Sequence, residues 1–200
     1  MDAIRAFIAI ELPDELRQAL DAVTHKLQEQ CVLAGGETAR KAVRWVPANN
    51  IHLTLKFLGE VSDANVQILA RKMQAATARH APFAIKIAGL GAFPNVRRPR
   101  VIWVGSEAPP NLASLQRAIE AETLSLGYPV EERPFSAHLT LGRISQSATP
   151  AEASALAHAL TEVQVGSLGC LLVDKVHLFQ SDLRPSGAIY TSLYTIPLVK

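Results

Sequence analysis

Apolar positions recur along this chain with two different periods, and each period predicts a different element. Short runs rich in β-branched residues, many of them apolar at alternate positions, predict strands, whereas apolar residues three and four positions apart predict helices. We expect strands at residues 5–12, 43–46, 51–58, 83–90, 100–106, 137–144, 171–180 and 189–198. We expect helices at residues 13–30, 64–79, 111–126 and 150–161.

Local signals mark where several of these elements begin and end. Thr149-Pro150-Ala151-Glu152 matches a capping box with proline at the first helical position. Gly127 follows the third helix and favours the left-handed conformation that ends a helix. Residues 33–42 contain adjacent glycines and are expected to form a loop, and residues 184–187 are expected to form a turn.

The order of elements nearly repeats, because each half of the chain supplies strands, helices and one strand with the sequence His-Leu-Thr-Leu. No low-complexity linker separates the halves. This order predicts an α+β fold with two lobes around antiparallel sheets, and a chain that crosses between the lobes. We treat residues 1–200 as a single domain.

Composition narrows the classes of function. Hydrophobic residues make up 48% of the chain, enough to fill a core, and 20 basic against 18 acidic residues leave a formal charge of +2. The chain therefore lacks the overall positive field that would indicate a nucleic-acid binder. Cys31 and Cys170 lack the spacing of a zinc or redox site and are expected to be free thiols. The first residues show no signal-peptide or membrane-span pattern, so we expect a cytoplasmic protein, a monomer without membrane contact.

The tetrapeptide His-Leu-Thr-Leu occurs twice, beginning at His52 and at His138. Successive side chains of a strand point to opposite faces, so His52 and Thr54 share one face while the leucines take the other. His138 and Thr140 repeat this arrangement. Two such strands facing each other would hold a phosphate-sized group between two imidazoles and two hydroxyls.

This set of groups suits phosphodiester cleavage without a metal. Displacement at phosphorus needs a base and an acid on opposite sides, and two imidazoles supply both near neutral pH. Threonine hydroxyls can donate to the non-bridging oxygens. A histidine that occurs alone in a strand is more often a hydrogen-bonded core residue, but the identical duplication favours catalysis. A metal site is the other alternative, although neither tetrapeptide offers a third ligand; we expect no metal and no cofactor.

At these residues the sequence resembles the two-histidine phosphoesterases, a family defined by two His-x-Thr-x motifs. It is most similar to the RNA 2′,3′-cyclic phosphodiesterases, also called 2′-5′ RNA ligases. The likeness extends over nearly the whole chain, in RAFIAIELP, NIHLTLKFLGEV, GAFPNVRRPRVIWVG, RPFSAHLTLGR and VHLFQSDLRPSGAIY. The resemblance implies a bilobal fold of two pseudo-symmetric antiparallel sheets with outer helices and a central cleft that holds both motifs.

The resemblance also implies a reaction and the residues that carry it out. Water opens a terminal RNA 2′,3′-cyclic phosphate to leave a 2′-phosphate, so the partner is an RNA end. By this resemblance His52 is the proton donor to the leaving 3′ oxygen, and His138 is the proton acceptor that activates water. Thr54 and Thr140 would bind the phosphate oxygens. The family also implies the reverse type of reaction, in which RNA ends are joined through a 2′-5′ linkage.

Two basic residues follow the tetrapeptides directly. Arg143 is a candidate phosphate ligand in the family pattern, but strand alternation turns it to the opposite face unless the strand bends at Gly142. A surface salt bridge is the alternative for Arg143. Lys56 continues the face of His52 and Thr54, so it is a candidate RNA contact or an exposed strand-end lysine.

Further candidates for RNA binding lie away from the tetrapeptides. Arg97, Arg98 and Arg100 concentrate positive charge in an expected loop, which could bind the RNA backbone or simply be solvated. Phe7 and Phe57 could stack on a base, although core packing is favoured for both.

Two other functions remain as alternatives. A cyclic phosphodiesterase acting on a small nucleotide would keep the same chemistry with a different substrate. A non-catalytic RNA-binding module would use the arginine run and bind RNA in a salt-dependent way without turnover. Turnover measured against chain length separates the first alternative from an RNA enzyme.

Overall fold

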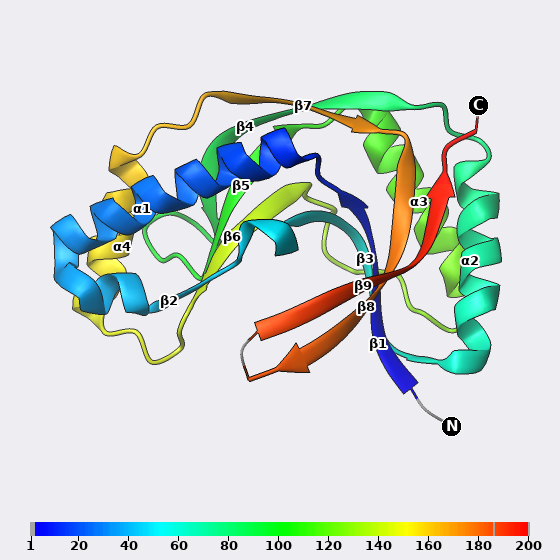
Figure 1. Ribbon diagram of the computed structural model, residues 1–200, viewed down its shortest axis with the longest axis horizontal. Coiled ribbons are helices and arrows are strands. Elements are labelled where there is room, and N and C mark those ends of the chain that lie inside the picture. Colours follow the sequence, from blue (N-terminus) through cyan, green and yellow to red (C-terminus); the bar gives the residue numbers. More distant parts are fainter. Residues whose placement is uncertain (1–2, 186, 200) are drawn as a thin grey trace.

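The computed structural model describes residues 3–185 and 187–199 (Figure 1). The elements in chain order are β1 (Ala3–Glu11), α1 (Asp14–Lys41), β2 (Val43–Trp45), the 3-10 turn η1 (Ala48–Asn50), β3 (His52–Ser62), α2 (Asp63–Thr77), β4 (Phe83–Phe93), β5 (Val101–Glu107), α3 (Pro110–Leu124), β6 (His138–Ile144), α4 (Pro150–Glu162), β7 (Ser167–Val173), β8 (Lys175–Arg184) and β9 (Gly187–Pro197). The mixture of antiparallel strands and helices confirms the predicted α+β class.

The strands form one antiparallel sheet in the order β7-β4-β5-β6-β3-β1-β8-β9, and β2 pairs with β6. The centre of the sheet is narrow, because β3 and β6 share a single register pair, Leu53 with Leu139. Two halves meet at this pair. We call β7, β4, β5, β6 and β2 the His138 half, and β3, β1, β8 and β9 the His52 half. The two expected sheets are these halves, joined through β3 and β6.

Each half is covered by two helices, as Figure 1 shows. α1 and α4 pack together over the His138 half, and α2 and α3 pack together over the His52 half. However, α1 follows β1 of the His52 half, and α3 follows β5 of the His138 half. The chain therefore crosses between the halves several times, and each half receives one helix that follows a strand of the other.

The main core lies between the sheet and the helices. The leucines of both tetrapeptides, Leu53, Leu55, Leu139 and Leu141, are at most 3% exposed. Helix residues such as Leu112 pack into the same core. Burying a leucine side chain stabilises the fold by roughly 1.5–3 kcal/mol, so these four side chains fix which face of β3 and β6 points inward.

The loop predicted at residues 33–42 is wrong. α1 continues to Lys41, with one non-helical residue, Gly36, at φ 71°. The preceding residue, Gly35, lies against α4, because a Cβ added to Gly35 would be 2.6 Å from the Cβ of Ala155. The two glycines therefore provide a kink and a close helix contact within α1, not a connection between elements.

The strand predicted at residues 171–180 is in fact two strands. Asp174 separates β7 from β8. β7 pairs with β4 in the His138 half, whereas β8 pairs with β1 in the His52 half. The backbone carbonyl of Asp174 accepts a hydrogen bond from the amide of Leu198 at 2.8 Å. One apolar run in the sequence therefore spans the crossing from one half to the other.

Other local predictions are confirmed. The hydroxyl of Thr149 accepts from the backbone of Glu152, whose carboxylate accepts from the backbone of Thr149, which completes the capping box. Gly127 has a φ of +88° just beyond α3. Cys31 and Cys170 are free thiols. The predicted turn at residues 184–187 includes Ser186, which lies outside the described residues. Among the helices described, none has the length and apolar composition that crossing a membrane requires.

Candidate active site

The two His-Leu-Thr-Leu segments lie side by side at the centre of the sheet. Leu53 of β3 and Leu139 of β6 are register partners, and directly paired residues point to the same side of a sheet. Both leucines are buried in the main core. The histidines and threonines next to them therefore point to the opposite side, which we call the histidine face.

The antiparallel pairing places each histidine beside the threonine of the other strand. Counting outward from the leucine pair, His52 faces Thr140, and His138 faces Thr54. Opposite residues on paired strands have Cβ atoms about 5 Å apart, and the strands separate beyond this one pair. A tetrahedral anion between the strands would meet one imidazole and one hydroxyl from each side.

A β-bulge lies at the last leucine of the tetrapeptide in both strands. On β3, Thr54 and Lys56 pair with the consecutive residues Ala9 and Ile8, which leaves Leu55 as the extra residue. On β6, Thr140 and Gly142 pair with the consecutive residues Trp103 and Ile102, which leaves Leu141 as the extra residue. An extra residue reverses the alternation of faces that follows it. The two strands therefore change face at equivalent positions.

The bulge on β6 turns Arg143 toward the histidine face. Arg143 pairs with Val101 and is exposed, whereas Ile144 is buried. The strand therefore bends at Gly142, as Arg143 requires in order to reach the histidine face. A Cβ on Gly142 would lie 2.6 Å from Cγ1 of Val43, so glycine is needed there for β2 to pack against β6.

The bulge on β3 turns Lys56 away from the histidine face, so the predicted RNA contact by Lys56 is wrong. The Lys56 side chain is only 3% exposed and forms an ion pair with Glu120 of α3, itself 6% exposed. Its ammonium also donates to the carbonyl of Pro129 at 2.7 Å. Gln116 donates to the other carboxylate oxygen of Glu120 at 3.1 Å. Lys56 is therefore a structural link between β3 and α3.

Both catalytic candidates have the same fixed tautomer. Nδ1 of His52 donates to the carbonyl of Asn50 at 2.8 Å, and Nδ1 of His138 donates to the carbonyl of Ser136 at 2.7 Å. A carbonyl oxygen can only accept, so each neutral imidazole carries its proton on Nδ1 and has a lone pair on Nε2. In both cases the acceptor lies two residues before the histidine. Each Nε2 is therefore free to exchange a proton with a ligand.

Aromatic side chains surround His52. Its ring stacks on Phe7 with the centroids 4.7 Å apart and meets Tyr190 edge to face at 5.2 Å. Phe7, Ala9 and Phe179 form a small second core on this face, with Tyr190 packed against it. Burial among these groups, together with the positive charges of Arg143 and His138, lowers the pKa of His52 from 6.5 to about 4, despite the Asn50 carbonyl.

His138 has fewer aromatic neighbours. Phe93 meets its ring edge to face with the centroids 5.0 Å apart. Burial is the main cause that lowers the pKa of His138, and the nearby guanidinium of Arg143 lowers it further. Arg143 thus affects the pKa of both imidazoles, which places its positive charge close to the pair.

The remaining basic candidates lie at the outer end of β6. Arg44 of β2 is the register partner of Arg143, so two guanidinium groups leave the same face of neighbouring strands, an arrangement that an anion between them would stabilise. Arg100 donates to the carbonyl of Ser145 at 3.4 Å. Arg97 and Arg98 are exposed in the loop between β4 and β5. The site thus has a basic side toward β2.

Sequence reasoning missed the aromatic residues around His52. Phe179 and Tyr190 are far from His52 in the chain and reach it only because β8 pairs with β1, and β9 with β8. Their sequence signal is weak, since an aromatic residue in a strand is ordinary core composition. Arg44 was also missed, because its value depends on the register between β2 and β6.

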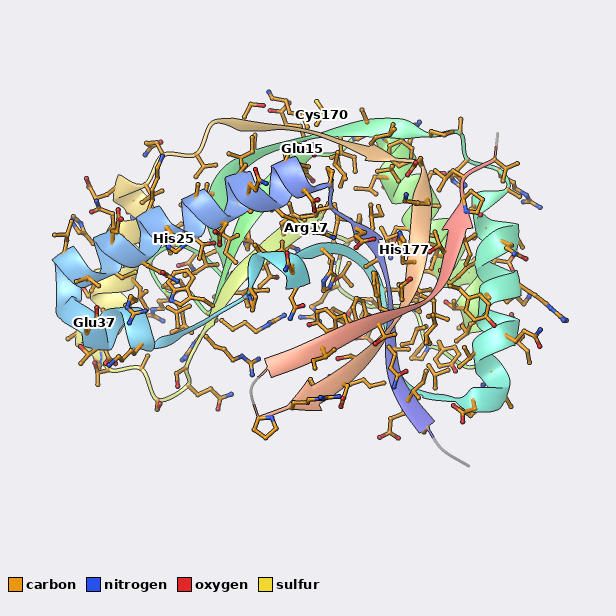
Figure 2. The ribbon with its side chains drawn as sticks, viewed as in Figure 1. Glu15, Arg17, His25, Glu37, Cys170 and His177 are labelled. Atoms are coloured by element: carbon orange, nitrogen blue, oxygen red, sulfur yellow. The ribbon has the colours of Figure 1, made fainter. Side chains whose placement is uncertain are left out.

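A small hollow of about 80 Å³ opens beside His52, lined by Phe7, Glu11, Arg17, Asn49, Asn50, Ile51, His52, Phe179 and Tyr190. Figure 2 shows Arg17 near the start of α1 and His177 on β8. Arg17 donates to Glu11 at 2.7 Å, and His177 lies 3.8 Å from the same carboxylate. This polar group borders the aromatic side of the site.

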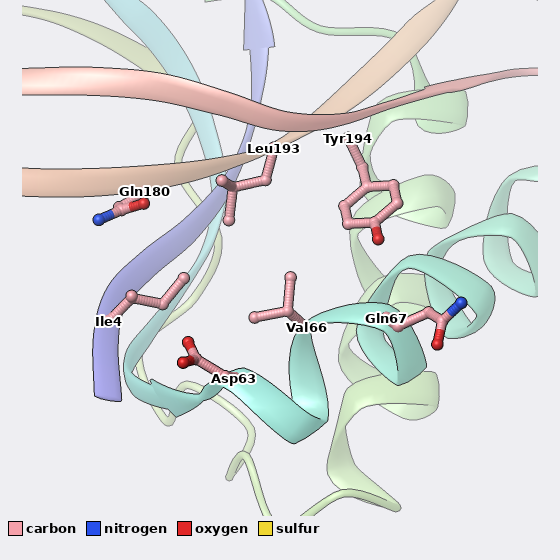
Figure 3. A pocket seen from close by; sticks show the side chains of 7 residues that line it. All are labelled: Ile4, Asp63, Val66, Gln67, Gln180, Leu193 and Tyr194. Atoms are coloured by element: carbon pink, nitrogen blue, oxygen red, sulfur yellow. The ribbon is translucent and has the colours of Figure 1, made fainter. Parts of the chain in front are cut away.

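A larger hollow of about 380 Å³ lies elsewhere, lined by Ile4, Asp63, Val66, Gln67, Gln180, Leu193 and Tyr194 (Figure 3). It contains neither tetrapeptide and no histidine, so we do not assign the chemistry to it. Within residues 3–185 and 187–199, no three His, Cys, Asp or Glu side chains cluster as a metal site would require.

Comparisons with known proteins agree with this arrangement. The family model described as LigT-like phosphoesterase matches residues 10–103 and 104–190. The chain is 33% identical to an RNA 2′,3′-cyclic phosphodiesterase from Methanothermobacter thermautotrophicus over 190 residues, which is 95% of this chain and 96% of that protein. It is 32% identical to the protein of the same name from Archaeoglobus fulgidus, with 95% and 98% covered.

Solved structures are similar over the whole chain. A protein from Thermus thermophilus has a TM-score of 0.76 at 28% identity, with 98% of each chain covered. LigT of E. coli without ligand has a TM-score of 0.74 at 26% identity, with 100% of each chain covered. The same E. coli protein has also been solved in complex with 3′-AMP. These similarities confirm the expected bilobal architecture.

Proposed function

This chain belongs to the LigT-like phosphoesterase family, and from that membership we propose that it hydrolyses a terminal RNA 2′,3′-cyclic phosphate to a 2′-phosphate without a metal ion. One observation carries the proposal: on the histidine face, two imidazoles with free Nε2 atoms alternate with two threonine hydroxyls. Relatives named RNA 2′,3′-cyclic phosphodiesterase, similar over nearly the whole chain, support the substrate.

The two imidazoles divide the proton transfers. His138 accepts a proton from water on Nε2 as the water oxygen forms a bond to phosphorus. His52, carrying a proton on both nitrogens, donates the Nε2 proton to the 3′ oxygen as the bond from phosphorus to that oxygen breaks. The products are a 2′-phosphate and a free 3′-hydroxyl. His52 ends neutral and His138 ends protonated, and exchange with solvent restores both.

This division requires the substrate to change the protonation of His52. Burial holds the pKa of His52 at about 4 without a ligand, so its imidazole is neutral at pH 7. A phosphate anion bound between the strands favours the charged imidazolium and raises this pKa. The profile of kcat/KM reports free enzyme and should peak below pH 6.5. The profile of kcat reports the complex and should lie at higher pH.

Threonine and arginine side chains bind the phosphate in this proposal. Thr54 and Thr140 donate to the non-bridging oxygens, where negative charge increases in the transition state. Arg143 supplies a guanidinium close to both imidazoles. Its register partner Arg44 adds a second positive charge at the same edge. These four residues position the phosphate and hold its charge.

The RNA chain beyond the reactive end lies toward the loop between β4 and β5 in this proposal. Arg97, Arg98 and Arg100 are exposed there and provide charge for the backbone phosphates. Lys56 has no part in this contact because it is buried. Ligation through a 2′-5′ linkage uses the same groups in the same roles, because a 5′-hydroxyl replaces water as the nucleophile and the 3′ oxygen again leaves. Cleavage of that linkage is the reverse step, in which the two histidines exchange roles.

Product analysis tests the proposal most directly. An oligonucleotide ending in a 2′,3′-cyclic phosphate is incubated with the protein in excess EDTA, and the product is identified by ³¹P NMR. We expect a 2′-phosphate at an undiminished rate. A 3′-phosphate product would mean that the 2′ oxygen leaves in place of the 3′ oxygen. Loss of turnover in EDTA that Zn²⁺ restores would refute the metal-independent route. Equal turnover of a mononucleotide and a decamer would indicate that the substrate is a small cyclic nucleotide.

A further inference from the structure

Asn50 forms two hydrogen bonds, one with its backbone and one with its side chain. Its carbonyl accepts from Nδ1 of His52 at 2.8 Å, and its side-chain amide donates to the backbone carbonyl of Ala188 at 2.8 Å. Because the carbonyl of Ala188 can only accept, the amide nitrogen of Asn50 faces it. Ala188 belongs to β9, 138 residues further along the chain. Asn50 therefore connects His52 to the hairpin of β8 and β9.

The turn η1 holds the backbone of Asn50. The amide of Asn50 donates to the carbonyl of Pro47 at 2.8 Å, and the amide of Ile51 donates to the carbonyl of Ala48 at 3.1 Å. Ile51 is 2% exposed, so it anchors the end of the turn in the main core. The turn is only three residues long, and 3-10 hydrogen bonds have poorer geometry than those of an α-helix. The side chain of Asn50 adds a second anchor for this short turn, on β9.

The same strand of the hairpin also contacts the ring of His52. Tyr190 meets that ring edge to face, with the centroids 5.2 Å apart. Ala188 and Tyr190 are two positions apart on β9, so they lie on the same face of the strand. His52, Asn50, Ala188 and Tyr190 form a closed circuit of contacts. The hairpin therefore reaches His52 twice, through an aromatic contact and through Asn50.

Phe7 supports the flat side of the His52 ring. The two rings are stacked with the centroids 4.7 Å apart, and Phe7 is 3% exposed, which confirms the core packing predicted for it. The same prediction is wrong for Phe57, which is 66% exposed. Stacking holds the plane of the His52 ring but barely distinguishes its two edges, since a half-turn of the ring keeps the same plane. The hydrogen bond from Nδ1 to Asn50 decides which edge faces the site.

The equivalent residue before His138 lacks such a link among the residues that the structure describes. Ser136 supplies the carbonyl that accepts from Nδ1 of His138 at 2.7 Å. It is exposed, and within the described ranges its hydroxyl forms no hydrogen bond. The carbonyl acceptor is therefore common to both halves, whereas the side-chain anchor occurs only in the His52 half.

The proton donor depends strongly on its orientation. Its Nε2 must point at the leaving 3′ oxygen as the bond to phosphorus breaks, and a displacement of about 1 Å can reduce a rate by about 10²-fold. We propose that Asn50 is a positioning residue, whose side-chain hydrogen bond to Ala188 holds the carbonyl that orients His52 as the proton donor. This inference rests on the proposed function and adds to it a residue that acts through His52.

The charges around His52 agree with this role. Burial lowers the pKa of His52, the carbonyl of Asn50 raises it, and the positive charges on β6 lower it further. Glu11, the register partner of His52, forms an ion pair with Arg17. Replacing Asn50 changes none of these charges. A further fall in the pKa of His52 in an Asn50 variant would therefore report a weaker hydrogen bond to the carbonyl.

The test compares three variants on two substrates. Asn50→Leu keeps a branched side chain without a donor, Asn50→Gln keeps the amide, and Asn111→Leu makes the same change at an exposed position in the first turn of α3. One substrate is an RNA decamer ending in a 2′,3′-cyclic phosphate. The other is the same decamer with sulfur as the 3′ leaving atom, which departs as a thiolate without needing a proton.

The loss should be confined to the step that needs the acid. On the oxygen substrate Asn50→Leu should reduce kcat by about 10–100-fold and leave KM unchanged. On the sulfur substrate it should match the original protein. Asn50→Gln should recover much of kcat, and Asn111→Leu should change neither rate. An equal loss on both substrates, a loss in KM alone, or no loss would each overturn the proposal.

NMR separates failure of this inference from failure of the proposed function. Turnover by the unsubstituted protein tests the function alone, whereas ¹⁵N spectra of the imidazole nitrogens test Asn50 without any reaction. In Asn50→Leu the pKa of His52 should fall and part of its neutral form should carry the proton on Nε2, while His138 stays unchanged. Asn50→Ala removes the same amide with a smaller side chain and should give the same spectra. An unchanged His52, or equal changes at both histidines, would refute the positioning role even in a protein that proved inactive on RNA.

Discussion

The His52 half and the His138 half share one backbone arrangement and differ in what surrounds it. Both strands carry His-Leu-Thr-Leu, both histidines donate from Nδ1 to the carbonyl two residues earlier, and both strands have a bulge at the second leucine. Yet His52 lies against Phe7 and Tyr190, whereas His138 meets a single aromatic ring, that of Phe93, among the described residues. The residue that turns inward is a buried lysine in one half and glycine in the other.

This difference shows how one arrangement can supply two unlike groups. Backbone geometry fixes where each Nε2 points, and it is the same in both halves. The surroundings set how readily each nitrogen takes a proton, and they are not the same. An acid and a base can therefore come from identical tetrapeptides, because the neighbouring strands provide the asymmetry.

Replacing the histidines should give the largest effect. His52→Ala and His138→Ala should each reduce kcat by about 10²–10⁴-fold. The two variants should differ in their rates on a substrate whose 3′ oxygen is replaced by sulfur, because a thiolate leaves without needing a proton. His52→Ala should then recover most of its rate, whereas His138→Ala should not, since water still needs a base. Recovery by His138→Ala alone would reverse the assigned roles.

Lys56 and Arg143 should separate stability from substrate binding. Lys56→Met leaves Glu120 buried without its partner, so we expect the free energy of unfolding to fall by about 3–5 kcal/mol in urea titrations. Lys56→Met combined with Glu120→Leu should recover much of this loss. Arg143→Met should keep the stability and weaken substrate binding. If instead Lys56→Met reduced the salt dependence of RNA binding, Lys56 would be an RNA contact after all.

The low pKa of His52 should appear as a dependence of stability on pH. A folded-state pKa of about 4 against about 6.5 when unfolded means that the unfolded chain binds the proton more readily between these values. The contribution of His52 to the free energy of unfolding should be fully present above pH 6.5. This free energy should fall by about 3 kcal/mol as the pH falls to 4. His52→Gln should remove more of this decline than His138→Gln. An equal change in both variants would mean that the two surroundings are equivalent.

Gly142 should tolerate no side chain, in contrast to its counterpart Lys56. Gly142→Ala would bring a Cβ to 2.6 Å from Val43, so β2 must shift, at a cost of about 1–3 kcal/mol. The shift should also displace Arg143 and raise KM. Gly166→Ala is the matched control, because a Cβ there meets nothing within 4 Å. Thermal unfolding and KM for both variants would show whether close packing against β2 is the reason that position 142 requires glycine.

Periodicity predicted most elements and the face shared by His52 and Thr54, because alternation is a local property of a strand. It failed at Lys56, where one extra residue in β3 reverses the alternation. The same kind of bulge turns Arg143 toward the site, and there Gly142 gave a visible signal. The bulge at Leu55 left none, since a leucine followed by a lysine is ordinary strand sequence.

Other failures arose from contacts between distant segments. Gly35 and Gly36 resemble a loop signal, but their cause is the approach of α1 to α4. Asp174 divides two strands that belong to different halves, within a run that is apolar on both sides. The aromatic neighbours of His52 come from β8 and β9, whose register against β1 no local pattern records.

The order of strands along the chain determines when the site becomes complete during synthesis. A ribosome-bound chain that has been made as far as Val173 already contains both tetrapeptides and every strand of the His138 half. It lacks β8 and β9, and therefore Phe179 and Tyr190 beside His52. This late hairpin completes the surroundings of His52. Until the hairpin has been made, His52 lacks Phe179 and Tyr190, two of the aromatic rings beside its own.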